Sequence, residues 1–245
     1  QCPLIPNTVW ICSNCQQQYP LLGQNQWNAL SSDFSEAAKD LYDDRGDTHN
    51  DTSAAVGYRN EHQQNIVISA FAAALKNRFR GSILDLGCGH GRFARSLIDR
   101  LGEPESITGI DLSAKQLSHV KSHRMHCFQA DASSTPFLDG QFDIVYSAEV
   151  IQYVKELEPF LLELSRITKL EGSIFLSTLH SGSFLRRLIK LTGVDSTQLG
   201  RLQLRSPKMI QAAAAEVGLR VARTKWLMAP LNLSITTEGY SAHFT

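Results

Sequence analysis

The 245-residue sequence lacks any hydrophobic run near the roughly 18 apolar residues that a membrane-spanning helix needs, which argues against a transmembrane protein. It also lacks an excess of charge, because 24 Lys and Arg residues balance 24 Asp and Glu residues. This balance disfavours nucleic acid as a partner bound through a strongly basic surface. The start of the sequence shows no charged segment followed by an apolar one, so we expect no signal peptide and a cytoplasmic location.

Cysteine is scarce, and the count of five is odd, which does not fit a scaffold held together by disulfide bonds. Three of the five, Cys2, Cys12 and Cys15, lie within residues 1–26. This stretch is rich in Gln, Asn and Pro and has little hydrophobic periodicity. It therefore predicts a small N-terminal module that differs from the rest of the chain.

The remaining sequence divides into a helical part and an alternating part. Residues 27–80 have a helical pattern, which the polar stretch 43–52 interrupts as an expected loop. After Gly81, short apolar runs alternate with amphipathic segments, which is typical of repeated βα units and a parallel sheet. We expect strands at 83–86, 107–110, 127–130, 142–146, 174–178, 221–227 and 241–245, and helices at 93–101, from 113, at 158–170 and at 206–218.

A glycine-rich turn follows the first of these strands. Residues 83–86 form a short apolar run, and Gly-Cys-Gly-His-Gly at 87–91 leads into the next helix. Glycines allow a tight turn with positive φ and let a ligand approach the backbone, while the helix offers free N–H groups at its start. Asp111 lies twenty positions after Gly91, where a carboxylate can accept both hydroxyls of a ribose. The pattern predicts a site for an adenosine-containing cofactor.

The spacing of this turn departs from the dinucleotide fingerprint, because Arg92 stands where that fingerprint has a glycine. The sequence Asp-Leu-Gly-Cys-Gly-His-Gly instead resembles motif I of the class I S-adenosylmethionine-dependent methyltransferases. Four further motifs of that family have counterparts here in the expected order, at 107–113, 128–132, 142–147 and 149–154. The resemblance implies an α/β, Rossmann-like fold for residues 81–245, with a seven-stranded, mostly parallel sheet and helices on both faces. It also implies S-adenosyl-L-methionine as cofactor.

The same resemblance assigns cofactor contacts residue by residue. It implies that Asp111 contacts the ribose, that Leu112, Asp131 and Ala132 contact the adenine, and that Ser147 lies near the methionine end. These positions follow the carboxyl ends of expected strands, where ligands gather in open α/β sheets. The contacts implied around the glycine-rich turn come from Asp85, Gly87, Cys88, Gly89 and Gly91.

The chemistry of methyl transfer guides the choice of catalytic candidates. A sulfonium methyl is already activated, so the protein mainly aligns the reactants. An oxygen or nitrogen acceptor that must lose a proton also needs a general base. We expect His180, just after the fifth strand, or Tyr153, where relatives often carry a histidine, to act as that base. Tyr146 and Glu149 are further options.

Two sequence features bear on the acceptor. No Asn-Pro-Pro-Tyr-type motif follows the fourth strand, and no cysteine lies at the tips of the fourth and fifth strands, which favours a small-molecule acceptor over a nucleic acid. Residues 184–191 place apolar side chains on one helical face and basic ones on the other, which fits a lid helix or a peripheral membrane contact. The helical stretch 27–80, with Tyr42, Tyr58 and Arg59, is expected to form a lid over the cofactor.

The N-terminal cysteines resemble a small zinc ribbon that precedes some methyltransferase domains. Cys12-Ser13-Asn14-Cys15 is a C-x-x-C followed by Tyr-Pro, and Cys2-Pro3 matches half of a first knuckle. A complete ribbon binds zinc through four thiolates, whereas Ile5 replaces one of them here. Cys2, Cys12 and Cys15 are the candidate metal ligands. The fourth ligand could be lost upstream, supplied by a histidine, or absent from a decayed ribbon, so zinc remains an open expectation.

We therefore predict a methyltransferase that acts on an oxygen or nitrogen of a natural-product or quinone-like acceptor. Its expected parts are a ribbon-like module at 1–26, a helical lid or linker at 27–80 and the methyltransferase domain at 81–245. Two alternatives remain, namely an rRNA base methyltransferase with a zinc-ribbon module and a cofactor-binding pseudo-methyltransferase without activity. The sequence does not specify the oligomeric state.

Overall fold

The structure is a computed structural model, and it describes residues 9–11, 18–23, 26–29, 54–120, 125–179, 203, 205–228 and 238–244. Several predicted functional residues lie outside the described residues. These are the zinc candidates Cys2, Cys12 and Cys15, the candidate base His180, the lid residue Tyr42 and the amphipathic stretch 184–191. The side chains of Tyr58 and Arg59 are also outside the description. The predictions made for all of these stay predictions.

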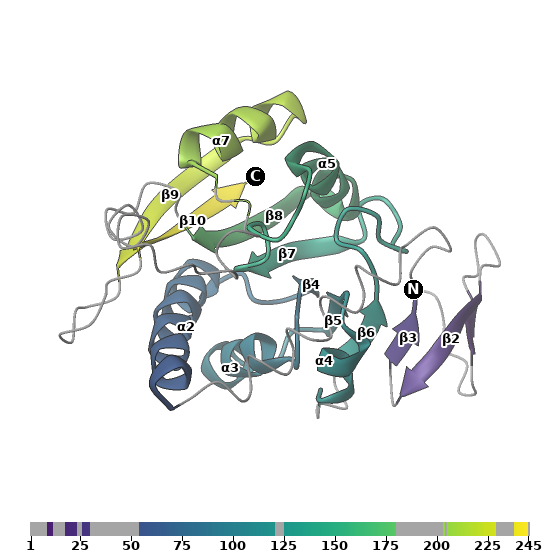
Figure 1. Cartoon of the computed structure of the whole chain (residues 1–245). Helices are drawn as coiled ribbons and strands as arrows, with labels where there is room; N and C mark the ends of the chain where they lie inside the picture. Colours follow the sequence, from purple (N-terminus) through teal and green to yellow (C-terminus); the bar gives the residue numbers. More distant parts are fainter. Residues whose placement is uncertain are drawn as a thin grey trace.

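One sheet organises the described part of the chain, with its strands in the order β1-β2-β3-β6-β5-β4-β7-β8-β10-β9 (Figure 1). In the spatial order β6-β5-β4-β7-β8, each strand is parallel to its neighbour, while β10 runs antiparallel to both β8 and β9. The seven strands from β4 onward thus form the expected mostly parallel sheet, and this prediction is confirmed. The strands are β1 (Val9–Ile11), β2 (Gln18–Gly23), β3 (Gln26–Asn28), β4 (Ser82–Leu86), β5 (Ser106–Asp111), β6 (Met125–Gln129), β7 (Phe142–Ala148), β8 (Thr168–Leu179), β9 (Val221–Met228) and β10 (Glu238–Phe244).

Helices cover both faces of the sheet, with α2 and α3 on one side and α5 and α7 on the other (Figure 1). Ser113 and Ser206 cap α4 and α7, because each hydroxyl accepts a hydrogen bond from the backbone N–H three residues later. None of the helices in the described ranges has the length and apolar character needed to span a membrane. The helices are α2 (Ala54–Leu75), α3 (Arg92–Leu101), α4 (Ala114–Ser118), α5 (Leu157–Ile167) and α7 (Pro207–Glu216).

Helix α5 ends earlier than its sequence predicts. The apolar pattern suggests a helix that continues to about Leu170, but β8 begins at Thr168, directly after Ile167. Thr168 pairs with Phe142 at the start of β7. Pairing in the sheet therefore overrides the local helical preference at this junction.

The core explains why β4 reads as an uninterrupted apolar run. Ile83 is fully buried and packs with Phe71 of α2 on one face of the sheet. Leu84 is fully buried on the other face, in the same cluster as Phe160 of α5 and Ile210 of α7. A central parallel strand buried on both sides has no polar face to show in its sequence.

The N-terminal strands extend the sheet beyond β6. Trp27 of β3 pairs in parallel with Phe128 of β6, and the backbone N–H of Ala29 donates to the Gln129 carbonyl at 2.8 Å. Gln26, which was expected to end the N-terminal module, is the first residue of β3. In the described residues, the sheet of the large domain therefore continues into this module.

The strand order also positions a crevice. The chain leaves β4 through α3 to reach β5 on one side, whereas β7 lies on the opposite side of β4. Such a reversal opens a crevice outside the carboxyl ends of the two central strands, and ligands of doubly wound folds bind there. The carboxyl ends of β4 and β7 are therefore the place to look for a functional site.

Candidate functional site

The turn after β4 is held in a conformation that requires glycine. Gly87, Gly89 and Gly91 have φ values of 81°, 54° and 73°. The backbone N–H groups of Gly87 and Cys88 both donate to the Ile110 carbonyl, at 2.8 and 2.9 Å. A Cβ at position 87 would lie 2.1 Å from Val150 Cγ2 in the loop after β7. Gly87 therefore serves both the backbone conformation and the close contact between the two loops.

The carboxylate of Asp111 ties this turn to the start of α4. Its Oδ2 accepts a hydrogen bond from the Gly89 N–H at 2.8 Å, and its Oδ1 accepts one from the Ser113 N–H at 2.9 Å. The side chain is only partly buried. A carboxylate offers about four lone-pair sites, so a group of this kind can bind several donors at once.

Asp85, at the end of β4, is a buried carboxyl group. Burial raises its pKa to about 7, while Tyr146 beside it lowers the pKa and the charge of Asp111 raises it. Asp85 Oδ2 makes no hydrogen bond within the described residues. The buried phenol of Tyr146 has a pKa well above its usual range, because of burial and the nearby Asp85. Asp85 therefore changes its charge near neutral pH, at the base of the crevice.

The Cys88 side chain belongs to the core rather than to the site. It is buried in a cluster with Met125 and Cys127, where the absence of a side chain at Gly109 leaves room for its sulfur. The Cys127 thiol and burial raise the pKa of Cys88 well above its usual value. A thiol that stays protonated is a poor nucleophile, so only the Cys88 backbone is available to a ligand.

His90, within the same turn, is half-buried beside Gln116 of α4. The His90 Nδ1 atom lies 3.3 Å from Gln116 Oε1. Burial lowers the pKa of His90, and Gln116 opposes that effect. The Gln116 side chain thus contacts the glycine-rich turn, while its backbone N–H donates to the Ser113 cap.

The residues expected to contact adenine come together at the ends of β5 and β6. The Leu112 carbonyl accepts from Gln129 Nε2 at 2.9 Å, and Asp131 Oδ1 accepts from the Ser133 N–H at 2.7 Å. Ala132 is partly buried against the main core cluster. Gln129 Oε1 is buried and makes no hydrogen bond within the described residues. These residues share one edge of the sheet with the glycine-rich turn.

Two predicted residues lie at the end of β7. Ser147 is buried, and its hydroxyl donates to the Leu86 carbonyl of β4 at 2.9 Å, so it joins the two central strands. Tyr153 is partly buried in the following turn, where its backbone N–H donates to the Val150 carbonyl at 2.7 Å. Both therefore lie at or just after the carboxyl end of β7.

Glu149 is a functional candidate that the sequence marks only weakly, as one option for a base. Its φ is 60°, and it is the one non-glycine residue with positive φ among the described residues. Its backbone N–H donates to the Ser177 carbonyl and to Ser177 Oγ. Burial raises the pKa of its carboxyl, and Arg92 opposes that change. Backbone strain of this kind gathers at active sites, and Glu has no preference for this conformation that its sequence could reveal.

The described residues fit S-adenosylmethionine. That cofactor carries an ammonium group, ribose hydroxyls and an adenine amino group, all of which are hydrogen-bond donors. The site offers the buried acceptors Asp85 Oδ2 and Gln129 Oε1, and the carboxylate of Asp111 lies at the end of the neighbouring strand. At the three left-handed glycines of the turn, no side chain keeps a ligand away from the main chain. For zinc the structure adds no group, since no cluster of three or more His, Cys, Asp or Glu side chains in the described ranges is placed to hold a metal.

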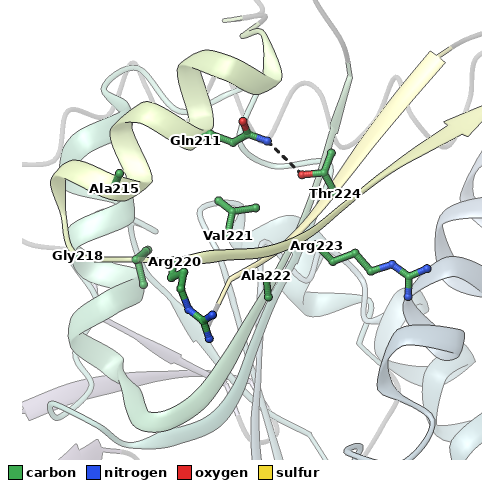
Figure 2. Close-up of a pocket in the computed structure, with 9 residues that line it drawn as sticks. Gln211, Ala215, Gly218, Arg220, Val221, Ala222, Arg223 and Thr224 are labelled. Atoms are coloured by element: carbon green, nitrogen blue, oxygen red, sulfur yellow. Dashed lines mark hydrogen bonds between the residues drawn. The ribbon is translucent and has the colours of Figure 1, made fainter.

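A second hollow lies elsewhere, between α7 and β9 (Figure 2). It has a volume of about 570 Å³, and Gln211 spans it by donating to Thr224 Oγ1 at 3.2 Å. Gly218 and Val221 place it at the amino end of β9. Because β9 runs in the same direction as β8, this hollow lies away from the carboxyl ends of the central strands. It is therefore separate from the crevice described above.

In sequence, the chain is similar to known methyltransferases. Residues 84–176 match a family described as a methyltransferase domain. A malonyl-[acyl-carrier protein] O-methyltransferase of Erwinia pyrifoliae is 33% identical over 146 residues, which cover 57% of this chain and 53% of the relative. A ubiquinone biosynthesis O-methyltransferase of Pelagibacter ubique is 29% identical over 156 residues, which cover 60% of this chain and 62% of the relative. In both cases the chain spans less than two thirds of the relative's length.

Solved structures show the same fold. A chain from the complex of the Haloferax volcanii Trm112 methyltransferase activator with a methyltransferase aligns with a TM-score of 0.61 and 19% identity, covering 82% of this chain and 97% of that chain. Geranyl diphosphate C-methyltransferase from Streptomyces coelicolor aligns with a TM-score of 0.56 and 18% identity, covering 72% and 76%. The family match and the named relatives make residues 84–176 a methyltransferase domain, and the solved structures show the fold of that domain alone.

Proposed function

We propose that the chain binds S-adenosylmethionine in the crevice beyond β4, β5 and β6 and transfers a methyl group to an oxygen atom of a small-molecule acceptor. The observation that carries this proposal is the left-handed turn 87–91, joined to the Asp111 carboxylate at the end of the next strand. In this position Asp111 is suited to accept from the ribose hydroxyls. Leu112, Asp131 and Ala132 line the adenine side, and the residues from Asp85 to Gly91 line the remainder.

The choice of oxygen rests on the relatives. Their names describe O-methyl transfer to a malonyl group on a carrier protein and in ubiquinone biosynthesis. A malonyl group presents a carboxylate, whereas a quinone precursor presents a phenol. Both fit the expectation of a small organic acceptor. We propose this class for the chain, with nitrogen as the less favoured site of attack.

The two acceptor types make different demands on the protein. S-adenosylmethionine supplies a methyl group that its sulfonium already activates. A carboxylate acceptor is ionised at neutral pH and needs only alignment, whereas a phenol, with a pKa of about 10, benefits from a base. Tyr153 and Glu149 lie on the loop that borders the crevice, and His180 is the remaining candidate. The need for a base thus depends on the acceptor.

A binding and transfer experiment tests the proposal on the full chain. Calorimetry with S-adenosylhomocysteine is expected to show saturable binding to one site. Transfer of tritiated methyl groups is then measured with malonyl-coenzyme A, with catechol and with total RNA. We expect label in one of the two small molecules and none in RNA. Absence of binding overturns the proposal, labelled RNA favours the rRNA alternative, and binding without transfer favours the pseudo-methyltransferase.

A further inference from the structure

The loop that follows β7, residues 149–155, borders the crevice and is called here the acceptor-side loop. It contacts the glycine-rich turn through Val150, which occupies the space that a side chain at Gly87 would need. It carries Glu149 in its left-handed conformation and the partly buried Tyr153. The position of this loop therefore decides what faces an acceptor from the side of β7.

Arg205, fifty residues further along the chain, reaches this loop. Its side chain is buried, with 8% of the residue exposed. Its Nη1 atom donates to the Ile151 carbonyl at 2.8 Å, and its Nη2 atom donates to the carbonyls of Val154 at 2.8 Å and Lys155 at 3.0 Å. Nη1 also lies 3.2 Å from the Gln203 carbonyl. These four acceptors all belong to the main chain.

This arrangement suits an arginine and no other residue. A guanidinium is planar and has five N–H donors in a fixed fork, so one side chain can serve carbonyls that point in different directions. A buried charge is tolerated only when its donors are satisfied, and buried carbonyls equally need donors. Burial lowers the pKa of Arg205, but an arginine remains protonated at neutral pH. The loop and the cation therefore stabilise each other.

The acceptor-side loop has further attachments to the same region. The Gln203 N–H donates to the Gln152 carbonyl at 2.7 Å. The buried Gln152 side chain accepts from Thr178 Oγ1 of β8 at 3.1 Å. The Glu149 N–H donates to Ser177, also in β8. The loop is thus fixed between β8 on one side and the residues just before α7 on the other.

We propose that Arg205 is a positioning residue for methyl transfer: it holds the acceptor-side loop in the one conformation that presents Glu149 and Tyr153 to the acceptor. Arg205 has no assigned contact with the cofactor, whose residues lie around β4, β5 and β6. The proposal deepens the proposed function and rests on it. It differs from a purely structural role because it separates binding of the cofactor from use of the acceptor.

The test compares Arg205→Met and Arg205→Lys with Arg223→Met, in which an exposed arginine of β9 is lost with the same change of charge. For each full-length variant, affinity for S-adenosylhomocysteine is measured by calorimetry and hydrogen exchange of the 150–155 amides by mass spectrometry. We expect Arg205→Met to keep the affinity within about twofold and to accelerate exchange of these amides at least about tenfold, with exchange elsewhere unchanged. Arg205→Lys, which keeps the charge without the fork, is expected to lie between Arg205→Met and the wild type.

Kinetics supply the functional readout, with malonyl-coenzyme A and catechol as acceptors. For the one that the wild type methylates, kcat/KM for the acceptor is expected to fall at least about tenfold in Arg205→Met and to stay unchanged in Arg223→Met. The proposal is overturned if the loop amides exchange as in the wild type, if exchange rises throughout the chain, or if affinity for S-adenosylhomocysteine falls in parallel. Failure of the wild type to bind S-adenosylhomocysteine instead overturns the proposed function. If Arg205→Met does not fold, Arg205→Lys decides by the same measurements.

Discussion

The two loops that meet at the crevice are built by different means. The glycine-rich turn 87–91 takes up its left-handed conformation at glycines and bonds to Ile110 and Asp111 of the neighbouring strand. The acceptor-side loop 149–155 takes up a left-handed conformation at a glutamate and is held by Ser177 and Arg205. The first loop needs no strain at its turning points, because glycine adopts these φ values freely. The second needs distant side chains to hold its conformation.

This difference separates two kinds of function. The proposed cofactor site is a turn whose backbone conformation is determined locally, by its own glycines. The surface that faces an acceptor is shaped by contacts from remote parts of the chain, so it can change without altering the turn. We expect substitutions in the two loops to act differently on folding, on cofactor binding and on methyl transfer.

Gly87→Ala is expected to lower the unfolding free energy most, because the added Cβ would lie 2.1 Å from Val150 Cγ2. Left-handed strain of about 1–2 kcal/mol and overpacking of about 1–3 kcal/mol together predict a loss of roughly 4 kcal/mol in unfolding free energy. Gly218→Ala is the matched control, because Gly218 has the same φ of 81° but open space around it. Denaturant unfolding should show a smaller loss for Gly218→Ala, which carries the left-handed strain without the overpacking. The double variant with Val150→Ala should recover part of the loss, and additive effects would contradict the contact.

Asp85, which precedes the glycine-rich turn, should make the unfolding free energy depend on pH, and Asp85→Asn should remove this dependence. Burial raises the pKa of its carboxyl to about 7 in the folded protein, well above the usual range of Asp, so folding favours the protonated form. The stability linked to Asp85 is present below about pH 4 and is lost as the pH rises through 7. Between pH 5 and pH 8 we expect the wild type to lose about 3 kcal/mol more unfolding free energy than Asp85→Asn. If the unfolding free energies of the two proteins change equally with pH across this range, then Asp85 is not the source of the dependence.

Asp111→Ala tests whether the glycine-rich turn and Asp111 bind the cofactor. Loss of the carboxylate should weaken binding of S-adenosylmethionine at least about tenfold, or roughly 1.4 kcal/mol. Asp99→Ala, at an exposed position on α3, is the control. Calorimetry decides, and thermal unfolding checks that the fold survives the loss of the carboxylate's hydrogen bonds from the Gly89 and Ser113 N–H groups. Unchanged affinity would remove the ribose assignment.

Glu149→Gly is expected to have the smallest effect and the opposite sign. Glycine adopts a φ of 60° without strain, so the variant should gain about 1 kcal/mol of unfolding free energy. Methyl transfer should fall because the carboxyl group is lost. Glu149→Gln removes the charge but keeps the strained backbone, and it should show no such gain in stability. If both variants unfold like the wild type, then the backbone at 149 stores no strain.

The comparison also explains which features could be predicted from the sequence. The glycine-rich turn and Asp111 are readable because residue type and spacing there are dictated by local backbone geometry. The strands of the central sheet are readable because burial on both faces gives apolar runs. The conformation of Glu149 and the reach of Arg205 leave no local pattern, since both depend on residues far away in the chain. The pairing of β3 with β6 is hidden for the same reason.

The junction of β3 and β6 bears on the order in which the chain is made. Trp27 leaves the ribosome about one hundred residues before its partner Phe128. Strand β3 therefore cannot pair in the sheet until β6 has been synthesised. Until then the edge of β6 has no cover, and afterwards it is closed by a piece of the same polypeptide. Strand β3 therefore joins the sheet only after its neighbour β6 has emerged, which makes this pairing a late step of assembly.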